Sequence, residues 1–77
     1  MNEQQLQNRT RIQELEVENW NLKHQIGINV DVTMDSGEVR RATTRSKAQM
    51  LSGHSAVIWL EGISGCYLLN RVRAVEL

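Results

Sequence analysis

Four basic side chains lie close together in the middle of the chain and are interleaved with hydroxyl side chains. The run contains Arg40, Arg41, Thr43, Thr44, Arg45, Ser46 and Lys47. Arginine and lysine neutralise phosphates and hydroxyls donate hydrogen bonds to them, so this composition fits contacts to a nucleic-acid backbone rather than to bases. Arg71 and Arg73 can join the same face in a small barrel. The alternative is a solvated strand face on which Lys and Arg prevent edge-to-edge pairing.

Two aromatic residues in the C-terminal part, Trp59 and Tyr67, are candidates for partner binding. Either residue could stack on a nucleobase or form part of a groove for a peptide. Alternation along a strand places Trp59 opposite Ile58 and Leu60, on the outer face of its sheet. The alternative for both aromatic residues is a place in the core or in an interface.

The sequence offers little that could support catalysis or metal binding. Cys66, His24 and His54 lie in three separate regions and lack the spacing of a zinc site. No carboxylate pair, phosphate-binding loop or activated nucleophile is recognisable. We therefore predict a protein that is not an enzyme and has no catalytic residues, metal or cofactor.

A short heptad pattern marks the N-terminal part of the chain. Its a and d positions are Ile12, Leu15, Asn19, Leu22 and Ile26. A single Asn at an a position selects a parallel, in-register dimer, because that pairing lets the two buried amides bond each other. In such a pair Arg11 faces Glu16, and Glu18 faces Lys23, so both contacts join opposite charges. The pattern predicts a parallel homodimer.

Trp20 lies away from the heptad stripe, on the same side of the helix as Val17. A tryptophan exposed on the outer face of a dimer would be unusual. We expect Trp20 to pack on the chain's own C-terminal part, or on further helices in a tetramer. The alternative is that Trp20 binds another protein.

Composition limits the classes of partner. The nine basic residues balance the nine acidic ones, so bulk charge indicates neither nucleic acid nor a membrane. The apolar run at 56–60 is too short to span a bilayer. Cys66 is the only cysteine and the first residues lack the apolar stretch of an export signal, so we expect a cytoplasmic protein with no membrane partner. A chain of 77 residues buries too little surface to be very stable alone, which favours oligomerisation.

The hydrophobic period changes at Gly27 and divides the chain into an oligomerisation helix (1–27) and a strand-rich domain (28–77). We predict a helix over about 3–26, with Gly27 ending it. Five strands are predicted, with tight turns after the first and the third; the first of these turns is at 35–37, with Gly37 at its positive-φ position. These strands are 28–34, 38–45, 56–61, 66–69 and 72–77. Residues 46–54 fit a loop, a helical turn or a strand extension.

One helix followed by five short strands resembles the Sm-like and wider SH3-like barrels, most closely the bacterial Sm-like RNA chaperones. The stretch 30–37 resembles the opening strand and turn of that family, and 63–75 resembles its closing motif. The resemblance implies a small five-stranded antiparallel SH3-like barrel, and hence an α+β protein with an N-terminal coiled-coil helix. The Lys-His pair with which the family reads RNA falls on Leu69 and Asn70, which leaves Arg71 as the neighbouring charge.

Two functions fit these observations. The first is a small homo-oligomeric protein that binds DNA or RNA through Arg40, Arg41, Arg45, Lys47, Arg71 and Arg73. The second is a protein-interaction module, such as the inhibitors or adaptors of host proteins that phages and plasmids encode, with Trp20, Trp59 and Tyr67 as candidate contacts. A continuous basic face would favour the first, and an exposed apolar patch bordered by mixed charges would favour the second.

Overall fold

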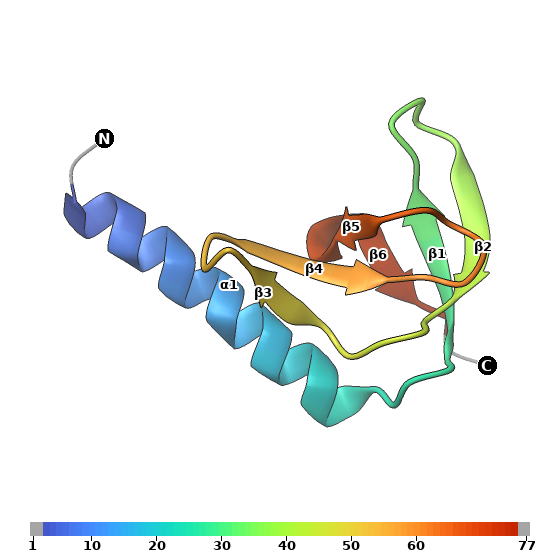
Figure 1. Cartoon of the computed structure of the whole chain (residues 1–77), viewed down its shortest axis with the longest axis horizontal. Coiled ribbons are helices and arrows are strands. Elements are labelled where there is room, and N and C mark those ends of the chain that lie inside the picture. Colours follow the sequence, from blue (N-terminus) through green and yellow to red (C-terminus); the bar gives the residue numbers. More distant parts are fainter. Residues whose placement is uncertain (1–2, 76–77) are drawn as a thin grey trace.

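A computed structural model describes residues 3–75 of the chain, and side chains from residue 9 to residue 75. One helix, α1 (Glu3–Lys23), precedes a set of antiparallel strands (Figure 1). The strands are β1 (Asn29–Thr33), β2 (Val39–Thr43), β3 (Gln49–Leu51), β4 (Ser55–Trp59), β5 (Cys66–Leu68) and β6 (Val72–Ala74), and the 3-10 helix η1 (Leu69–Arg71) precedes β6. The α+β class predicted from the sequence is confirmed. The last two residues of the predicted fifth strand lie outside the described residues.

The strands form two three-stranded sheets rather than one closed five-stranded barrel, so that part of the prediction is wrong. The strand orders are β2-β1-β6 and β3-β4-β5. Strands β5 and β6 are each an edge of their own sheet and do not pair with each other. The reason lies in η1, which carries the chain from one sheet to the other and buries Leu69 between them.

The sixth strand comes from the segment 46–54. Strand β3 pairs with β4, placing Gln49 opposite Val57, whereas β2 pairs with β1. The two sheets meet just after β2, where Thr44 bridges Leu60. There the N–H of Glu61 donates to the carbonyl oxygen of Thr43 at 2.8 Å. Residues 46–54 thus contain a separate short strand of the second sheet, β3, between a connection at 46–48 and a turn at 52–54.

Helix α1 ends at Lys23, three residues before the predicted end. The N–H of His24 still donates to the carbonyl oxygen of Trp20, at 2.9 Å, and the chain then turns toward β1. Gly27 has a φ of 95°, and its N–H donates to both the hydroxyl and the carbonyl oxygen of Thr44. These bonds require Gly27 to lie beside the end of β2, so the helix cannot continue to it. Ile26 therefore lies in a turn.

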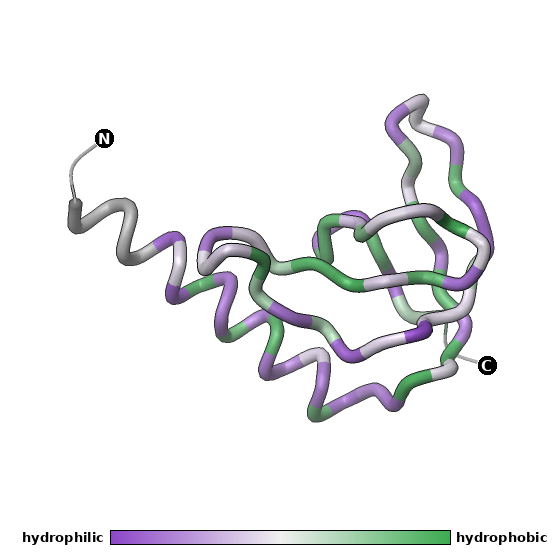
Figure 2. The backbone as a smooth tube through the Cα atoms, in the orientation of Figure 1, coloured by the Kyte–Doolittle hydropathy of each residue, from purple (hydrophilic) through white to green (hydrophobic). Residues whose placement is uncertain are grey.

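The core lies between the two sheets and under α1. It contains Val30, Val32, Ala48, Ala56, Ile58, Leu60, Leu69 and Val72. Figure 2 shows β4 as apolar along most of its length, whereas α1 mixes polar and apolar residues. The tight turn predicted before β2 is present, with Gly37 at a φ of 90°. The β1–β2 hairpin projects away from the helix (Figure 1).

Candidate functional site

One face of α1 packs against the chain's own β3-β4-β5 sheet. Gln13 Oε1 accepts a hydrogen bond from the N–H of Ala56 at 2.7 Å, near the start of β4. Val17 and Trp20 pack against the core. Of the alternatives open for Trp20, the structure shows it packed within its own chain. These contacts fix which side of α1 faces solvent.

A pair of hydrogen bonds fixes the C-terminal half of α1. Asn21 Nδ2 donates to the carbonyl oxygen of Ala48 at 3.0 Å, and the N–H of Ala48 donates to Asn21 Oδ1 at 2.9 Å. The amide thus satisfies both backbone groups of a buried residue, as a neighbouring strand would. Sequence reasoning missed both amides, although Gln13 and Asn21 recur eight residues apart on the side of the helix that carries Val17.

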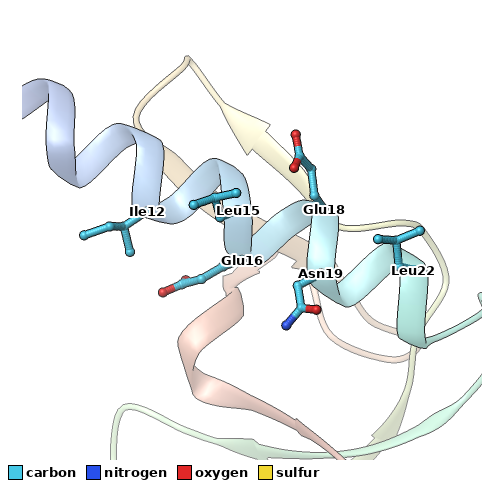
Figure 3. Close-up of a pocket in the computed structure, with 6 residues that line it drawn as sticks. All are labelled: Ile12, Leu15, Glu16, Glu18, Asn19 and Leu22. Carbon is cyan, nitrogen blue, oxygen red and sulfur yellow. The ribbon is translucent and has the colours of Figure 1, made fainter.

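The opposite side of α1 is apolar and open to solvent. We call it the heptad face, which consists of Ile12, Leu15, Asn19 and Leu22. Ile12 is 56% exposed, Leu15 46% and Leu22 87%. At 3.6 residues per turn, the mean direction of this face is about 165° away from that of Gln13, Val17, Trp20 and Asn21. Figure 3 shows the heptad face with Glu16 and Glu18 at its borders.

Ile26, the last position of the predicted heptad pattern, is exposed but does not continue this face. It lies beyond Lys23, the last residue of α1, in the turn that leads to β1. The heptad face therefore covers two heptads.

The β3-β4-β5 sheet has a second apolar surface on the side away from the core, and its exposed members are Leu51 and Leu68. Pairing places Val57 beside Gln49 and Leu68, and places Trp59 beside Cys66. We call this surface the outer sheet face, and its apolar members are Leu51, Val57, Trp59, Cys66 and Leu68. The sequence indicated Trp59 but missed the two leucines, which reach this face only through the pairing of β3 and β5 with β4. Tyr67, on the opposite side of β5, packs against the core.

The predicted basic residues lie at several places rather than in one cluster. Arg41 and Arg73 both lie opposite Asp31, on either side of β1. Arg41 Nε donates to Asp31 Oδ1 at 2.8 Å, so the carboxylate balances one of these two charges. Arg71 lies 3.7 Å from the carboxylate of Asp35 in the hairpin turn.

Four of the basic residues have no carboxylate partner within the described part of the chain. They are Arg40, Arg45, Lys47 and Arg73. Arg40 is exposed on β2, where its register partner is Val32. Arg45 and Lys47 are exposed in the connection between β2 and β3. The N–H of Arg45 donates to the carbonyl oxygen of Trp59 at 3.0 Å, which holds this connection beside the outer sheet face.

The remaining candidates for chemistry are dispersed. His24 packs on Trp20 with ring centroids 4.4 Å apart, and His54 is exposed in the turn before β4. Among the side chains described, from residue 9 to residue 75, no three His, Cys, Asp or Glu gather in a way that could hold a metal ion. Over residues 3–75, no helix is both long and apolar enough to cross a membrane. Apart from the unpaired basic residues, the features of the described residues that could support a function are therefore two surfaces, the heptad face and the outer sheet face.

Comparison with known proteins adds no further constraint. No protein family, curated protein or solved structure matches this chain. The function must therefore be inferred from the geometry of the two apolar faces and the unpaired cations.

Proposed function

We propose that this protein is a homodimeric protein-interaction module, in which α1 pairs in parallel with α1 of a second copy through the heptad face. One observation carries the proposal. The heptad face lies on the side of α1 opposite to the side held by Gln13, Trp20 and Asn21. A second helix can therefore approach from the side of Leu15 and Leu22, whereas Ile12 and Asn19 also line pockets that reach Asn70 in η1.

The charges beside the heptad face favour a parallel partner. Glu16 and Glu18 border the face, and in a parallel pair they meet Arg11 and Lys23 of the second copy. Within one chain Arg11 contacts Glu14 at 3.2 Å, and both side chains are largely exposed. Exposed pairs of this kind contribute about 0 to 1 kcal/mol, so Arg11 can exchange Glu14 for the partner's carboxylate at little cost.

The contacts between α1 and the sheets explain how so short a heptad face can be sufficient. An isolated helix pair of about two heptads would be only marginally stable, because ordering the two helices would offset most of the free energy of association. Here α1 is already held by the side chains of Gln13 and Asn21 and by the packing of Trp20. Association then orders mainly the side chains of the heptad face.

Disulfide trapping tests the orientation. Two single-cysteine proteins are made in a Cys66→Ser background, one with Ile12→Cys and one with Leu22→Cys, and they are mixed in equal amounts and oxidised. A parallel dimer brings each new cysteine against its own copy, so cross-links between identical proteins should dominate. In an antiparallel pair centred on the heptad face residue 12 lies against residue 22, whereas in a parallel pair about 15 Å along the helix keeps these two positions apart. A dominant mixed cross-link would contradict the parallel arrangement.

Nucleic-acid binding is the second candidate function. The observation that favours it is that Arg40, Arg45, Lys47 and Arg73 have no carboxylate partner in the described part of the chain, whereas Arg41 and Arg71 do. Unpaired exposed cations can neutralise phosphates. A dimer would present each of them twice. The wide distribution of these residues makes this candidate the weaker of the two.

We further propose that the two sheets are an open form of the SH3-like barrel that the sequence resembles. The contacts where the sheets meet support this proposal, because Thr44, directly after β2, bridges Leu60, directly after β4. Amide exchange tests it. The Glu61 N–H, which bonds to Thr43 where the sheets meet, should exchange about as slowly as the amides inside β4. Exchange at the rate of an exposed loop would contradict a single continuous sheet.

A further inference from the structure

The outer sheet face has a composition that is unusual for a solvated strand surface. Antiparallel sheets with one face on the core normally alternate, with polar residues on the other face. Here β4 places Val57 and Trp59 on the outer side, while Ala56, Ile58 and Leu60 point to the core. Val57 is buried although it lies outside the core, and its neighbours Gln49 and Leu68 flank it.

Exposed leucines and a basic connection border the outer sheet face. Leu51 is 44% exposed and Leu68 43%, on the two edge strands. Trp59 lies between them and the connection that carries Arg45 and Lys47. Two hydrogen bonds to the backbone of Trp59 hold that connection in place. The N–H of Arg45 donates to the carbonyl oxygen of Trp59, and the N–H of Trp59 donates to Ser46 Oγ at 3.2 Å.

The charge at this border is unbalanced. The connection carries Arg45 and Lys47, neither of which meets a carboxylate in the described part of the chain. Glu61 continues the alternation of Val57 and Trp59 and adds one negative charge. An apolar surface with a cationic border is complementary to an apolar segment flanked by carboxylates.

We propose that the outer sheet face binds an apolar peptide segment of another protein that carries Asp or Glu beside its apolar residues. The indole of Trp59 and the side chains of Leu51 and Leu68 contact the apolar residues, and Arg45 and Lys47 contact the carboxylates. Tryptophan and arginine are the side chains that most often dominate such contacts. This inference rests on the proposed role as an interaction module but not on dimerisation. Leu68 shares a pocket with Ile12 of the heptad face, whereas Leu15 does not line that pocket.

Selection from a library of random 12-residue peptides displayed on phage tests the proposal. The full-length protein is the bait, and enriched peptides are synthesised and titrated by fluorescence anisotropy. We expect enriched peptides to contain apolar residues with more Asp and Glu than Lys and Arg. Trp59→Ala should weaken their binding about tenfold or more, the loss typical of a dominant interface tryptophan.

Two further pairs of variants keep the test decisive. If Trp59→Ala perturbs folding, Leu51→Lys and Leu51→Glu replace one exposed residue by opposite charges. The enriched peptides should bind Leu51→Lys more tightly than Leu51→Glu. Leu15→Glu, on the heptad face, should leave peptide binding unchanged even if it abolishes dimerisation. Enriched peptides that lack an acidic excess, bind equally to both Leu51 variants, or lose binding with Leu15→Glu would overturn the proposal, as would failure to enrich any peptide.

Discussion

The side-chain amide of Asn21 makes two hydrogen bonds to the backbone of Ala48. It donates to the carbonyl oxygen at 3.0 Å and accepts from the N–H at 2.9 Å. Ala48 is 3% exposed and precedes β3 directly. Asn21 thus links the docked side of the helix to the bend between the sheets. The same link turns the heptad face outward, so the proposed dimer depends on a contact made within each subunit.

Replacing Asn21 should therefore destabilise the fold itself. Asn21→Ala leaves both backbone groups of Ala48 without their partner, and we expect a loss of about 2 kcal/mol in the free energy of unfolding. Urea denaturation followed by circular dichroism measures it. Asn70→Ala, which removes an exposed amide from η1, is the control and should change stability by less than about 0.5 kcal/mol. Equal losses in the two variants would show that the Asn21 bonds contribute nothing specific.

Replacing Thr44 by valine, which has nearly the same shape, should also destabilise the fold. Its hydroxyl is buried and accepts hydrogen bonds from the N–H groups of Gly27 at 2.9 Å and Ile28 at 3.2 Å. Thr44→Val keeps the packing but removes the acceptor, so we expect a loss of about 1 to 2 kcal/mol. Thr43→Val, one residue away and half-buried, is the matched control. It removes only a long, exposed hydrogen bond from the Thr43 hydroxyl to Asn29 Oδ1, at 3.4 Å, and should be nearly neutral. A neutral Thr44→Val would mean that Thr44 does not hold the turn into β1.

The sequence predicted the parts of the fold that depend on local pattern. Alternation located β1, and the glycine at 37 located its turn, because glycine lacks a Cβ and adopts a positive φ at no steric cost. The change of period at Gly27 separated the helix from the strands. Each of these features is determined by residues that are close together in the sequence.

The features that the sequence did not predict depend on contacts between distant residues. The helix end at Lys23 is set by Gly27 bonding to Thr44, seventeen residues away. Strand β3 has only three residues and becomes recognisable through its pairing with β4. The outer sheet face likewise needs β3 and β5 to bring Leu51 and Leu68 beside β4. For the site, residue types alone indicated six basic residues, and only the register showed that Asp31 balances Arg41.

Nucleic-acid binding makes a separate prediction about salt. If the unpaired cations of a dimer engage about four to six phosphates, the log–log salt slope should be roughly −3 to −5. Arg45→Ala should flatten the slope by about one unit for each phosphate that the variant no longer neutralises, and it should weaken all sequences alike. Arg9→Ala, which removes an exposed charge from α1, is the control. Titrations of labelled DNA and RNA that show no binding below about 100 μM at low salt would exclude this candidate.

Asn19, the asparagine of the heptad face, should lower the stability of the dimer while it selects one register and one oligomeric state. In the proposed dimer Asn19 lies against its own copy, so Asn19→Leu should raise the melting temperature of the dimer and permit other registers or larger oligomers. Melting curves at two concentrations and light scattering measure both effects. A protein whose melting temperature and oligomeric state are unaffected by Asn19→Leu would show that Asn19 is not buried between subunits.

Sedimentation equilibrium tests the dimer most directly. Wild type should sediment, over about 5 to 200 μM, with a mass rising toward twice the 8.8 kDa of the chain. Leu15→Glu, on the heptad face, should give the monomer mass. Leu51→Glu, at an almost equally exposed leucine on the outer sheet face, should remain dimeric. A wild type that stays at the monomer mass throughout, or a Leu15→Glu variant that still dimerises, would contradict the account.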